Sequence, residues 1–292
     1  MSDRLLGQPD SVVVTGASTG IGATCVRHLD QLGFRVFAGV RQAEDGVVLK
    51  IDASPRLTPL LLDVTDSASI TEAAKTVQAS VGMFGLAGLV NNAGISVNGP
   101  IELVTLPEWR RQFEVNLFGL TAVTQAFLPM LRLGRGRVIN MSSIAGRSTM
   151  PFMAPYSASK HAVEALSDAL RIELQQFGIH VSVIEPGAIA TPIWRKSKQE
   201  ADAQHASWSA EAQRLYAEGV SKVKDAAMKA ADRAAPASLV ATAIEHALMS
   251  PQPKTRYLVG FDAKIRALLS AMLTDRLQDR LLTWAIKLPP RT

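Results

Sequence analysis

Short apolar runs alternate with amphipathic helical stretches along most of this chain, and this alternation constrains the fold more than any other feature. The runs are rich in Val, Ile and Leu and end at Gly, Asp or Ser, as buried strands do. Strands of this kind, separated by helices, favour a parallel sheet that is covered on both faces and wound through right-handed crossovers. The sequence therefore predicts a doubly wound α/β fold around a parallel sheet of seven strands.

The expected elements follow from hydrophobic period and from helix-capping signals. Asp66 or Ser67 begins one helix and Gly82 ends it, and Pro107 suits the first turn of another. The strands are predicted at 11–15, 34–40, 58–64, 86–94, 136–143, 179–187 and 255–260, and the helices at 21–33, 66–82, 107–133, 156–178, 238–250 and 261–288.

The domain organisation predicted for this length is one core with appendages. Residues 1–292 form a single domain, because α/β chains of this size often do. Within it, residues 191–235 are rich in Ala, Lys, Gln, Ser and Asp with weak periodicity, which indicates a helical substrate lid. Residues 261–292 form a helical C-terminal tail.

Composition excludes several classes of protein. Hydrophobic residues make up 47 % of the chain and the net charge is +5, with Lys and Arg scattered rather than clustered, so we expect no nucleic-acid binding. The only cysteine, Cys25, leaves no internal disulfide. The start of the chain has no signal-peptide core and no apolar run approaches about 18 residues. A cytoplasmic protein without a membrane span is therefore expected.

Two other chemistries find no support in the sequence. The histidines form no paired metal-ligand spacing with each other or with Cys25, so no metal site is predicted. No G-x-S-x-G elbow is present, which argues against a serine hydrolase. The five histidines are His28, His161, His180, His205 and His246.

A glycine-rich turn between the first strand and the first helix indicates a dinucleotide. In TGASTGIG, glycines let the backbone turn sharply and approach a pyrophosphate over the N-terminus of the helix. The alternative is an ordinary tight turn. The residues assigned to this turn are Gly16, Ser18, Thr19, Gly20, Ile21 and Gly22.

The spacing G-x-x-x-G-x-G, followed by NNAG at 91–94, resembles the short-chain dehydrogenase/reductase family, whose domain is a Rossmann fold. The resemblance becomes specific at PYSASKHA, where Tyr156 and Lys160 stand four apart and share one helix face. In that family the tyrosine is the general acid or base, the lysine lowers its pKa and holds the nicotinamide ribose, and a serine thirteen residues earlier polarises the carbonyl. That serine is Ser143 here.

A fourth family position is an asparagine in the preceding long helix, whose main-chain carbonyl helps to hold a proton-relay water. Asn116 in FEVNLFGL matches it. Taken alone, Asn116 is more simply a polar residue tolerated in a helix, but the ordered set with Ser143, Tyr156 and Lys160 favours catalysis. Strand alternation turns Ser142 away from Ser143, so Ser142 is left out of the set.

The resemblance also implies contacts to the cofactor. In LLDV, Asp63 and Val64 match the adenine contact, although an aspartate there also suits a turn. The NNAG segment offers a contact near the adenine-side ribose, and EPGAIAT would line the nicotinamide. The residues in these last two segments are Asn92, Ala93, Gly94, Pro186, Gly187, Ile189 and Thr191, and Tyr156 and Lys160 also belong to the cofactor set.

The choice between NADP and NAD rests on the end of the second strand. NAD-binding folds place an acid about 20 residues after the glycine turn; this chain has Val40 and Arg41 there. An arginine pairs with a 2′-phosphate, so NADP(H) is preferred and NAD(H) remains possible. Thr19 occupies a position where NADP-preferring relatives often carry a basic residue. The alternative is that Arg41 points to solvent.

The residues expected to surround the substrate are mostly apolar. Met150, Phe152 and Met153 precede the tyrosine, and the lid adds Trp194, with Ile193 and Trp208. These side chains either pack internally or form an adaptable apolar wall. With Ser143 and Tyr156, we assign Met150, Phe152 and Trp194 to a substrate site for a small lipophilic alcohol or ketone, similar to the steroid and retinoid branch of the family.

Two further expectations concern partners. The tail has apolar residues at helical spacing with arginines between them, so it packs on its own domain or touches a membrane surface or partner. The family commonly forms dimers and tetramers through its two long helices, and we expect a homodimer or homotetramer.

The hypothesis is an oxidoreductase that uses NADP(H) to interconvert a hydroxyl and a carbonyl on a lipophilic substrate. One alternative is a dinucleotide-binding regulatory protein without turnover. The other is an NAD-dependent dehydrogenase of a small polar alcohol.

Overall fold

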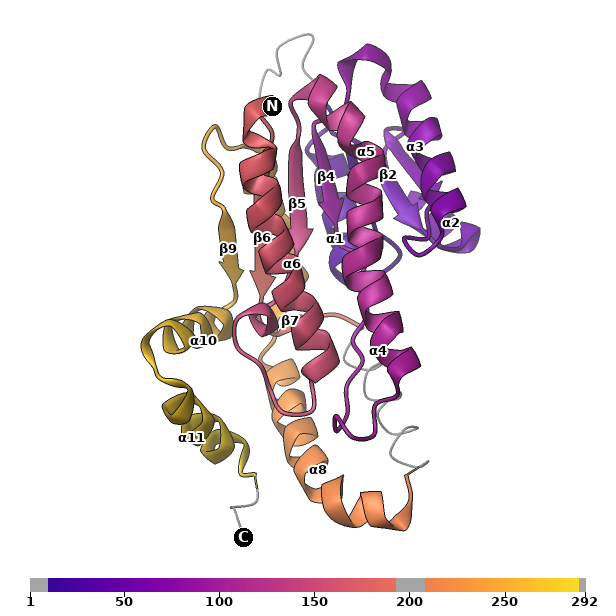
Figure 1. The fold of residues 1–292 in the computed structure, drawn as a ribbon. Helices are drawn as coiled ribbons and strands as arrows, with labels where there is room; N and C mark the ends of the chain where they lie inside the picture. The colour runs from indigo at the N-terminus through magenta and orange to yellow at the C-terminus, as the bar shows by residue number, and fades with distance from the viewer. Residues whose placement is uncertain (1–9, 193–207, 289–292) are drawn as a thin grey trace.

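The computed structural model describes residues 10–192 and 208–288, which form one central sheet with helices on both faces (Figure 1). Its seven strands run in the order β3-β2-β1-β4-β5-β6-β9, and every registered pair is parallel. The predicted doubly wound fold and its seven strands are confirmed. The strands are β1 Ser11–Val14, β2 Arg35–Val40, β3 Leu57–Leu61, β4 Gly88–Asn91, β5 Arg137–Met141, β6 His180–Pro186 and β9 Arg256–Val259.

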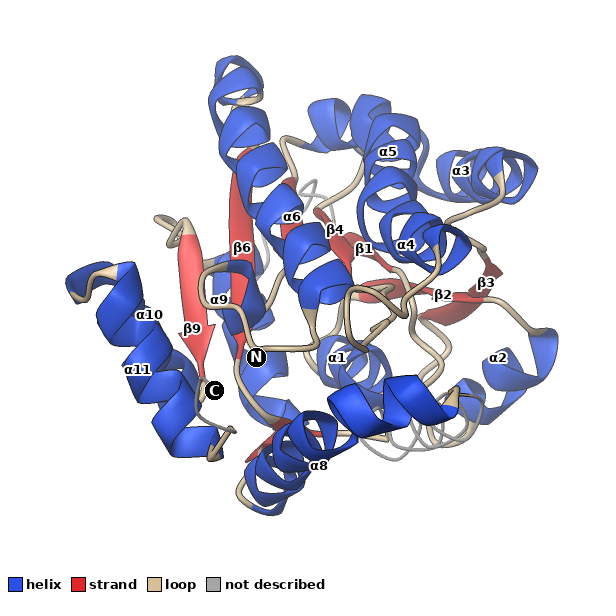
Figure 2. Ribbon diagram, turned by 60° about the horizontal axis from the view of Figure 1, so that its bottom comes forward, coloured by secondary structure: helices blue, strands red, loops and turns tan. Residues whose placement is uncertain are grey.

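Two helical layers cover the sheet, as the two views together show (Figure 2). The side chains of β1 alternate between them: Val12 and Val14 pack in one apolar cluster and Val13 in the other. The first cluster includes α1 Gly20–Gln31, α2 Ala43–Lys50 and α9 Ala237–Met249; the second includes α3 Ser67–Val81, α5 Leu120–Gly134 and the end of α6 Ala154–Glu173.

Most helix boundaries follow their capping residues. The Asp66 side chain caps α3 and Gly82 ends it at φ +55°, as expected. The helix predicted over 107–133 begins one residue earlier, where Thr105 and Glu108 form a capping box at α4 Leu106–Phe113. Between α4 and α5 the backbone takes π-helical turns over Glu114–Gly119, which no sequence period predicts.

Strand ends and one helix differ from expectation. The strand predicted over 86–94 ends at Asn91, because the Thr15 hydroxyl accepts hydrogen bonds from the backbone of Asn92 and Ala93 and bends the chain. Helix α2 was not predicted, and it places Glu44 in its first turn. A two-residue ladder of β7 Ile189–Ala190 and β8 Ala235–Pro236 is also additional.

The last third of the chain supplies the edge strand β9 and helix α9, and it also places helices near the carboxyl end of the sheet (Figure 1). Of the segment 191–235, the structure describes a 23-residue helix, α8 Ala210–Asp232. The tail forms two helices rather than one, α10 Phe261–Met272 and α11 Asp275–Ile286, because Thr274 starts a new helix after Leu273. Ala263 and Ala267 pack inward, whereas Trp284 is 79 % exposed.

One long helical stretch, Leu106–Gly134, is apolar enough to cross a membrane by length and composition alone. Its inner face, with Val123, Phe127 and Leu131, is fully buried against the sheet layer. We therefore interpret it as a core helix of this domain.

Candidate active site

The predicted site residues gather at the carboxyl edge of the sheet, where β1, β4, β5 and β6 end. β1 lies between β2 and β4, so the order of the strands reverses at this point. Open parallel sheets bind ligands in the crevice formed at such a reversal. The turns after these four strands carry most of the residues singled out from the sequence.

The glycine turn after β1 has the geometry that only glycine accepts readily. Gly16 and Gly20 have φ of +64° and +58°. A Cβ on Gly22 would lie 2.2 Å from the carbonyl oxygen of Gly16, so no side chain fits between the turn and α1. Asn92 holds this turn by donating hydrogen bonds of 2.9 and 3.0 Å to the carbonyls of Thr15 and Gly16.

The N-terminus of α1 fits an anionic group. Thr19 occupies the N-cap but makes no side-chain hydrogen bond to the helix, and no acidic residue lies in the first turn. The first N–H groups of a helix need an acceptor and carry partial positive charge. The pyrophosphate of a dinucleotide would satisfy both requirements here. Ser18 and Ile21 are half-buried beside the exposed Thr19.

The residues predicted to lie near the adenosine differ in their exposure and in their contacts. Arg41 is exposed directly after β2. Asp63 accepts hydrogen bonds from the Thr65 amide and hydroxyl at 2.9 and 2.7 Å, so it forms the turn that the sequence left open as an alternative. Val64 is buried against Gly119, whose Cβ would lie 2.6 Å from the Val64 carbonyl. Ala93 packs against Gly16.

Ser143 and Tyr156 are brought together from separate elements. Ser143 follows β5, and its hydroxyl accepts a hydrogen bond from the Ala145 amide at 3.1 Å and donates to the Pro186 carbonyl at 3.4 Å. Tyr156 lies in the first turn of α6. Burial raises the pKa of the Tyr156 phenol, and its hydrogen bond with Ser143 lowers it in part.

Lys160 follows one turn later on α6 and is buried. Its ammonium donates a 2.7 Å hydrogen bond to the Met141 carbonyl and lies 5.8 Å from the centre of the Tyr156 ring. Burial lowers the pKa of Lys160 to about 8, while the carboxylate of Glu164 acts in the opposite direction. A buried cation therefore stands close to the phenol at neutral pH.

Asn116 lies in the π-helical segment, at 1 % exposure. Its side-chain amide makes two hydrogen bonds to the backbone of Ile95. It accepts from the Ile95 amide at 2.9 Å and donates to the Ile95 carbonyl at 3.1 Å. Gln112 and Ser159 complete this cluster, since both amide side chains donate to the Ser159 hydroxyl at 3.2 Å. The side chain of Asn116 thus joins the loop after β4 to α4 and α6.

Gln112 and Ser159 were missed from the sequence. Gln112 could have been predicted from the sequence, because it precedes Asn116 by four residues and so lies on the same helix face. Thr15 and Met141 were also missed. The Thr15 hydroxyl holds the Asn92 turn, and the backbone carbonyl of Met141, which no sequence pattern marks, accepts the hydrogen bond from Lys160.

The segment after β6 closes the other side of the crevice. A Cβ on Gly187 would lie 2.2 Å from the Asp262 carboxylate, which also accepts a 2.8 Å hydrogen bond from the Ala188 amide. Thr191 lies opposite the glycine turn, 3.4 Å from where a Cβ on Gly20 would be. Ile189 is buried in β7. Asp262 fixes this segment and was not predicted.

The residues predicted to contact substrate lie on a loop under α8. Phe152 has φ of +62°, its carbonyl accepts a 2.7 Å hydrogen bond from the Gly99 amide, and its ring meets Tyr216 edge-on at 6.5 Å. The Tyr216 hydroxyl hydrogen-bonds to the Glu102 carboxylate. Met150 is half-buried in the same loop, and the predicted contact Trp194 lies outside the described residues, as does Ile193.

Fold and site together define a dinucleotide-binding oxidoreductase, and comparison with known proteins identifies its family. The family model for short chain dehydrogenases matches residues 10–202. Retinol dehydrogenase 7 of Rattus norvegicus is 38 % identical over 97 % of this chain and 91 % of its own length. The 17-beta-hydroxysteroid dehydrogenase type 6 of Bos taurus is 38 % identical over 94 % and 88 %.

Solved structures agree with these relatives. A short chain dehydrogenase from Burkholderia cenocepacia, crystallised in complex with NADP, superposes with a TM-score of 0.70 at 27 % identity, covering 98 % of this chain and all of that one. The chain belongs to the short-chain dehydrogenase family and is a nicotinamide-dependent oxidoreductase of CH–OH groups. The predicted family and enzyme class are confirmed.

Proposed function

We propose that this enzyme uses NADP(H) to interconvert a hydroxyl and a carbonyl on a lipophilic substrate of steroid or retinoid type, with Tyr156 as the general acid and base. The observation that carries the proposal is the arrangement of Ser143, Tyr156 and Lys160 on two elements that meet at the carboxyl edge of the sheet.

Each of the three side chains has a role that its surroundings support. In the reducing direction, Ser143 donates a hydrogen bond to the substrate carbonyl and Tyr156 gives its proton to the same oxygen. The nicotinamide, when bound, supplies the hydride. Burial alone would keep the phenol neutral, so the Lys160 ammonium stabilises the phenolate that this step leaves.

Asn116 serves this site through the backbone. In the π-helical turns over Glu114–Gly119 the hydrogen bonds shift to i→i+5, and such turns occur often at functional sites. We infer that the main-chain carbonyl of Asn116 holds a water toward Lys160, while its side chain, which is already engaged by Ile95, keeps this turn in place.

The preference for NADP(H) rests on Arg41. It is exposed at the end of β2, next to the crevice, and the acids that follow it lie in the first turn of α2 rather than beside the strand end. A guanidinium binds a 2′-phosphate through two hydrogen bonds, whereas a carboxylate would repel it. The NADP complex of the Burkholderia cenocepacia relative supports this choice.

The lipophilic substrate class draws on two supports. Curated relatives covering most of this chain are named for retinol and for 17-beta-hydroxysteroids. In the structure, Met150 and Phe152 lie in the loop that leads into α6, and the Phe152 ring packs on Tyr216 of α8. We infer that α8, in the described part of segment 191–235, is a lid over this apolar wall, held in place by the hydrogen bond between Tyr216 and Glu102.

We also propose an oligomeric state, a membrane contact and a cellular compartment for this enzyme. Exposed apolar residues support a homodimer or homotetramer formed through the two long helical stretches: Phe118 in the π-helical turns before α5, Leu133 on α5 and Ile172 on α6. The exposed apolar side chains of α10 and α11 support peripheral contact with a membrane surface. The buried Cys25, whose thiol pKa is raised by burial to about 12, suits a reducing compartment such as the cytoplasm.

The proposed function is tested by turnover of a substrate panel. Purified enzyme is supplied with NADPH or NADH and with matched pairs of retinoid, steroid and short polar carbonyl compounds, and the absorbance of the reduced nicotinamide is followed. We expect the highest kcat/KM with NADPH and an apolar ketone or aldehyde. Turnover confined to small polar compounds with NADH would favour the polar-alcohol alternative, and binding without turnover the regulatory one.

A further inference from the structure

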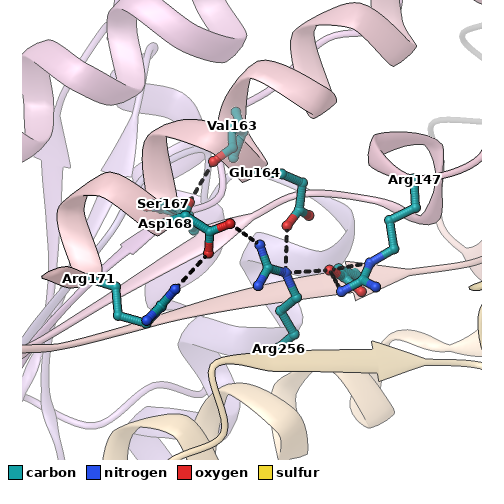
Figure 3. A network of polar contacts seen from close by, with 9 residues as sticks. Arg147, Val163, Glu164, Ser167, Asp168, Arg171 and Arg256 are labelled. Atoms are coloured by element: carbon teal, nitrogen blue, oxygen red, sulfur yellow. Dashed lines mark hydrogen bonds and ion pairs between the residues drawn. The ribbon is translucent and has the colours of Figure 1, made fainter. Parts of the chain in front are cut away.

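Where α6 packs on β6, an ionic network that the proposed mechanism does not use joins these two elements to Arg256 of β9 and to Arg147 (Figure 3). Glu185 of β6 has no exposed side-chain surface, and the side chain of Glu164 on α6 is 11 % exposed. Both carboxylates contact one atom, the Nε of Arg256 on β9, at 3.0 Å from Glu164 and 3.3 Å from Glu185. Arg147 adds a 2.8 Å contact to Glu185.

Each of these two carboxyl groups has one oxygen that lacks a partner. Glu164 uses Oε2 and Glu185 uses Oε1 for their arginines, while Glu164 Oε1 and Glu185 Oε2 are buried without a hydrogen-bond partner among the described residues. A buried ionised oxygen left unpaired is costly. Two carboxylates held at one nitrogen also repel each other, and one shared proton relieves both costs, as in other paired carboxyls.

We propose that Glu164 and Glu185 hold one proton between them at neutral pH and act as a positioning pair that sets the charge state of Lys160, a role that rests on the proposed catalytic function. Glu185 is the carboxylic acid of the pair, and Glu164 is its ionised member. The order of burial supports this assignment, because the fully enclosed Glu185 loses more hydration on ionising than Glu164 does.

The link to the active site runs along α6. Glu164 follows Lys160 by one turn, and its negative charge opposes the effect of burial on the Lys160 ammonium. Gly146 brings the loop after β5 close to both residues, since its Cβ would lie 3.1 Å from the Lys160 carbonyl and 3.2 Å from Glu164 Cγ. Release of the shared proton from Glu185 therefore adds a negative charge to a pair whose other member, Glu164, lies one turn from Lys160.

The other charged groups around Glu164 and Glu185 come from the elements packed against them. Arg256 of β9 also binds Asp168 of α6 at 2.7 Å, and Asp168 binds Arg171 at 3.1 Å, both nearer to solvent. Arg147 follows the loop after β5. From α10, Arg266 donates to Ser148 beyond this loop. Burial and the Glu164 charge raise the pKa of Glu185 to about 7 against the two arginines.

The shared proton is tested first by measuring the Tm of the protein as a function of pH, which requires no enzyme turnover. A carboxyl group whose folded pKa is raised contributes stability below its unfolded pKa and loses it as pH rises through about 7. Between about pH 5 and pH 8 we expect the Tm of the wild type to fall by roughly 4 °C or more. Glu185→Gln has the size and neutrality of the protonated acid and should abolish this fall, whereas Asp168→Asn, at another carboxylate that contacts Arg256, should retain it.

The link to Lys160 is tested by titrating its side-chain ¹³C resonance, assigned by its loss in Lys160→Met. Glu164→Gln removes the nearby negative charge, so the Lys160 pKa should fall by about one unit, and the alkaline limit of kcat/KM for reduction should move with it. Glu164→Asp should restore part of this shift.

Equal slopes of Tm against pH in wild type and Glu185→Gln would overturn the shared proton. An unchanged Lys160 titration in Glu164→Gln would overturn the link. Because the unfolding and resonance measurements need no substrate, they remain decisive if the enzyme fails to reduce any tested ketone, which would count against the proposed function instead.

Discussion

The ammonium of Lys160 lies 5.8 Å from the centre of the Tyr156 ring while it donates a 2.7 Å hydrogen bond to the Met141 carbonyl. The cation is thus fixed beside the phenol by the end of β5 rather than by contact with the phenol itself. The family resemblance implies that lysine lowers the pKa of tyrosine, whereas in this structure burial keeps the pKa of Tyr156 raised.

The pH dependence of reduction should report Lys160. Its pKa is lowered to about 8, so the ammonium is present below that pH and is lost above it. Without the charge, the phenolate left by proton donation is no longer stabilised. We expect kcat/KM for ketone reduction to be level near neutrality and to fall above about pH 8. A rate that stays level to pH 10 would show that Lys160 does not control the proton step.

Ser143 and Ser142 provide a matched pair. Ser143 contacts Tyr156, whereas Ser142 is a buried neighbour in the same segment that belongs to no part of the proposed machinery. Ser143→Ala should lower kcat by roughly 10²-fold or more because a hydrogen bond to the reacting oxygen is lost. Ser142→Ala should retain the wild-type rate. Equal losses in the two variants would assign the effect to packing after β5.

The sequence was sufficient for those parts of the fold and site that depend on local pattern. The parallel sheet of seven strands follows from the alternation of strands and helices, and the Tyr156 and Lys160 pair follows from their spacing on one helix face together with the family resemblance. Helix α2 escaped prediction because AEDGVVLK lacks an amphipathic period and is held by its packing on β3. The Glu185 and Arg256 contact depends on the pairing of β6 with β9, residues far apart in the chain.

Arg41 should decide the preference between the two nicotinamide cofactors. Arg41→Ala removes a charge-assisted contact to the 2′-phosphate, which NADP has and NAD lacks. We expect the Kd for NADPH, measured by fluorescence titration, to rise by about tenfold or more, while the Kd for NADH changes little. Arg56→Ala, at an exposed arginine that precedes β3 at the opposite edge of the sheet, should affect neither. Equal losses for both cofactors would remove Arg41 from the phosphate site.

The tail should bind anionic membranes. Its exposed face combines apolar side chains such as Leu268 and Trp284 with the exposed cations Arg276 and Arg280, the combination found in interfacial helices. In co-sedimentation with phosphatidylserine vesicles, Leu268→Glu together with Trp284→Ser should reduce the bound fraction several-fold. Met83→Glu, at an equally exposed apolar residue away from the tail, should bind like the wild type. No difference between these variants would rule out the tail as the contact.

The central claim is that Tyr156 transfers the proton, and Tyr156→Phe tests it most directly. The phenyl ring preserves the packing of α6 while the hydroxyl that Ser143 contacts is removed. The measurement is the rate of NADPH oxidation with the best apolar ketone of the panel, with unchanged NADPH binding as the control for folding. The proposed mechanism predicts a loss of roughly 10²–10⁴-fold in kcat. Equal rates for Tyr156→Phe and the wild type would contradict it.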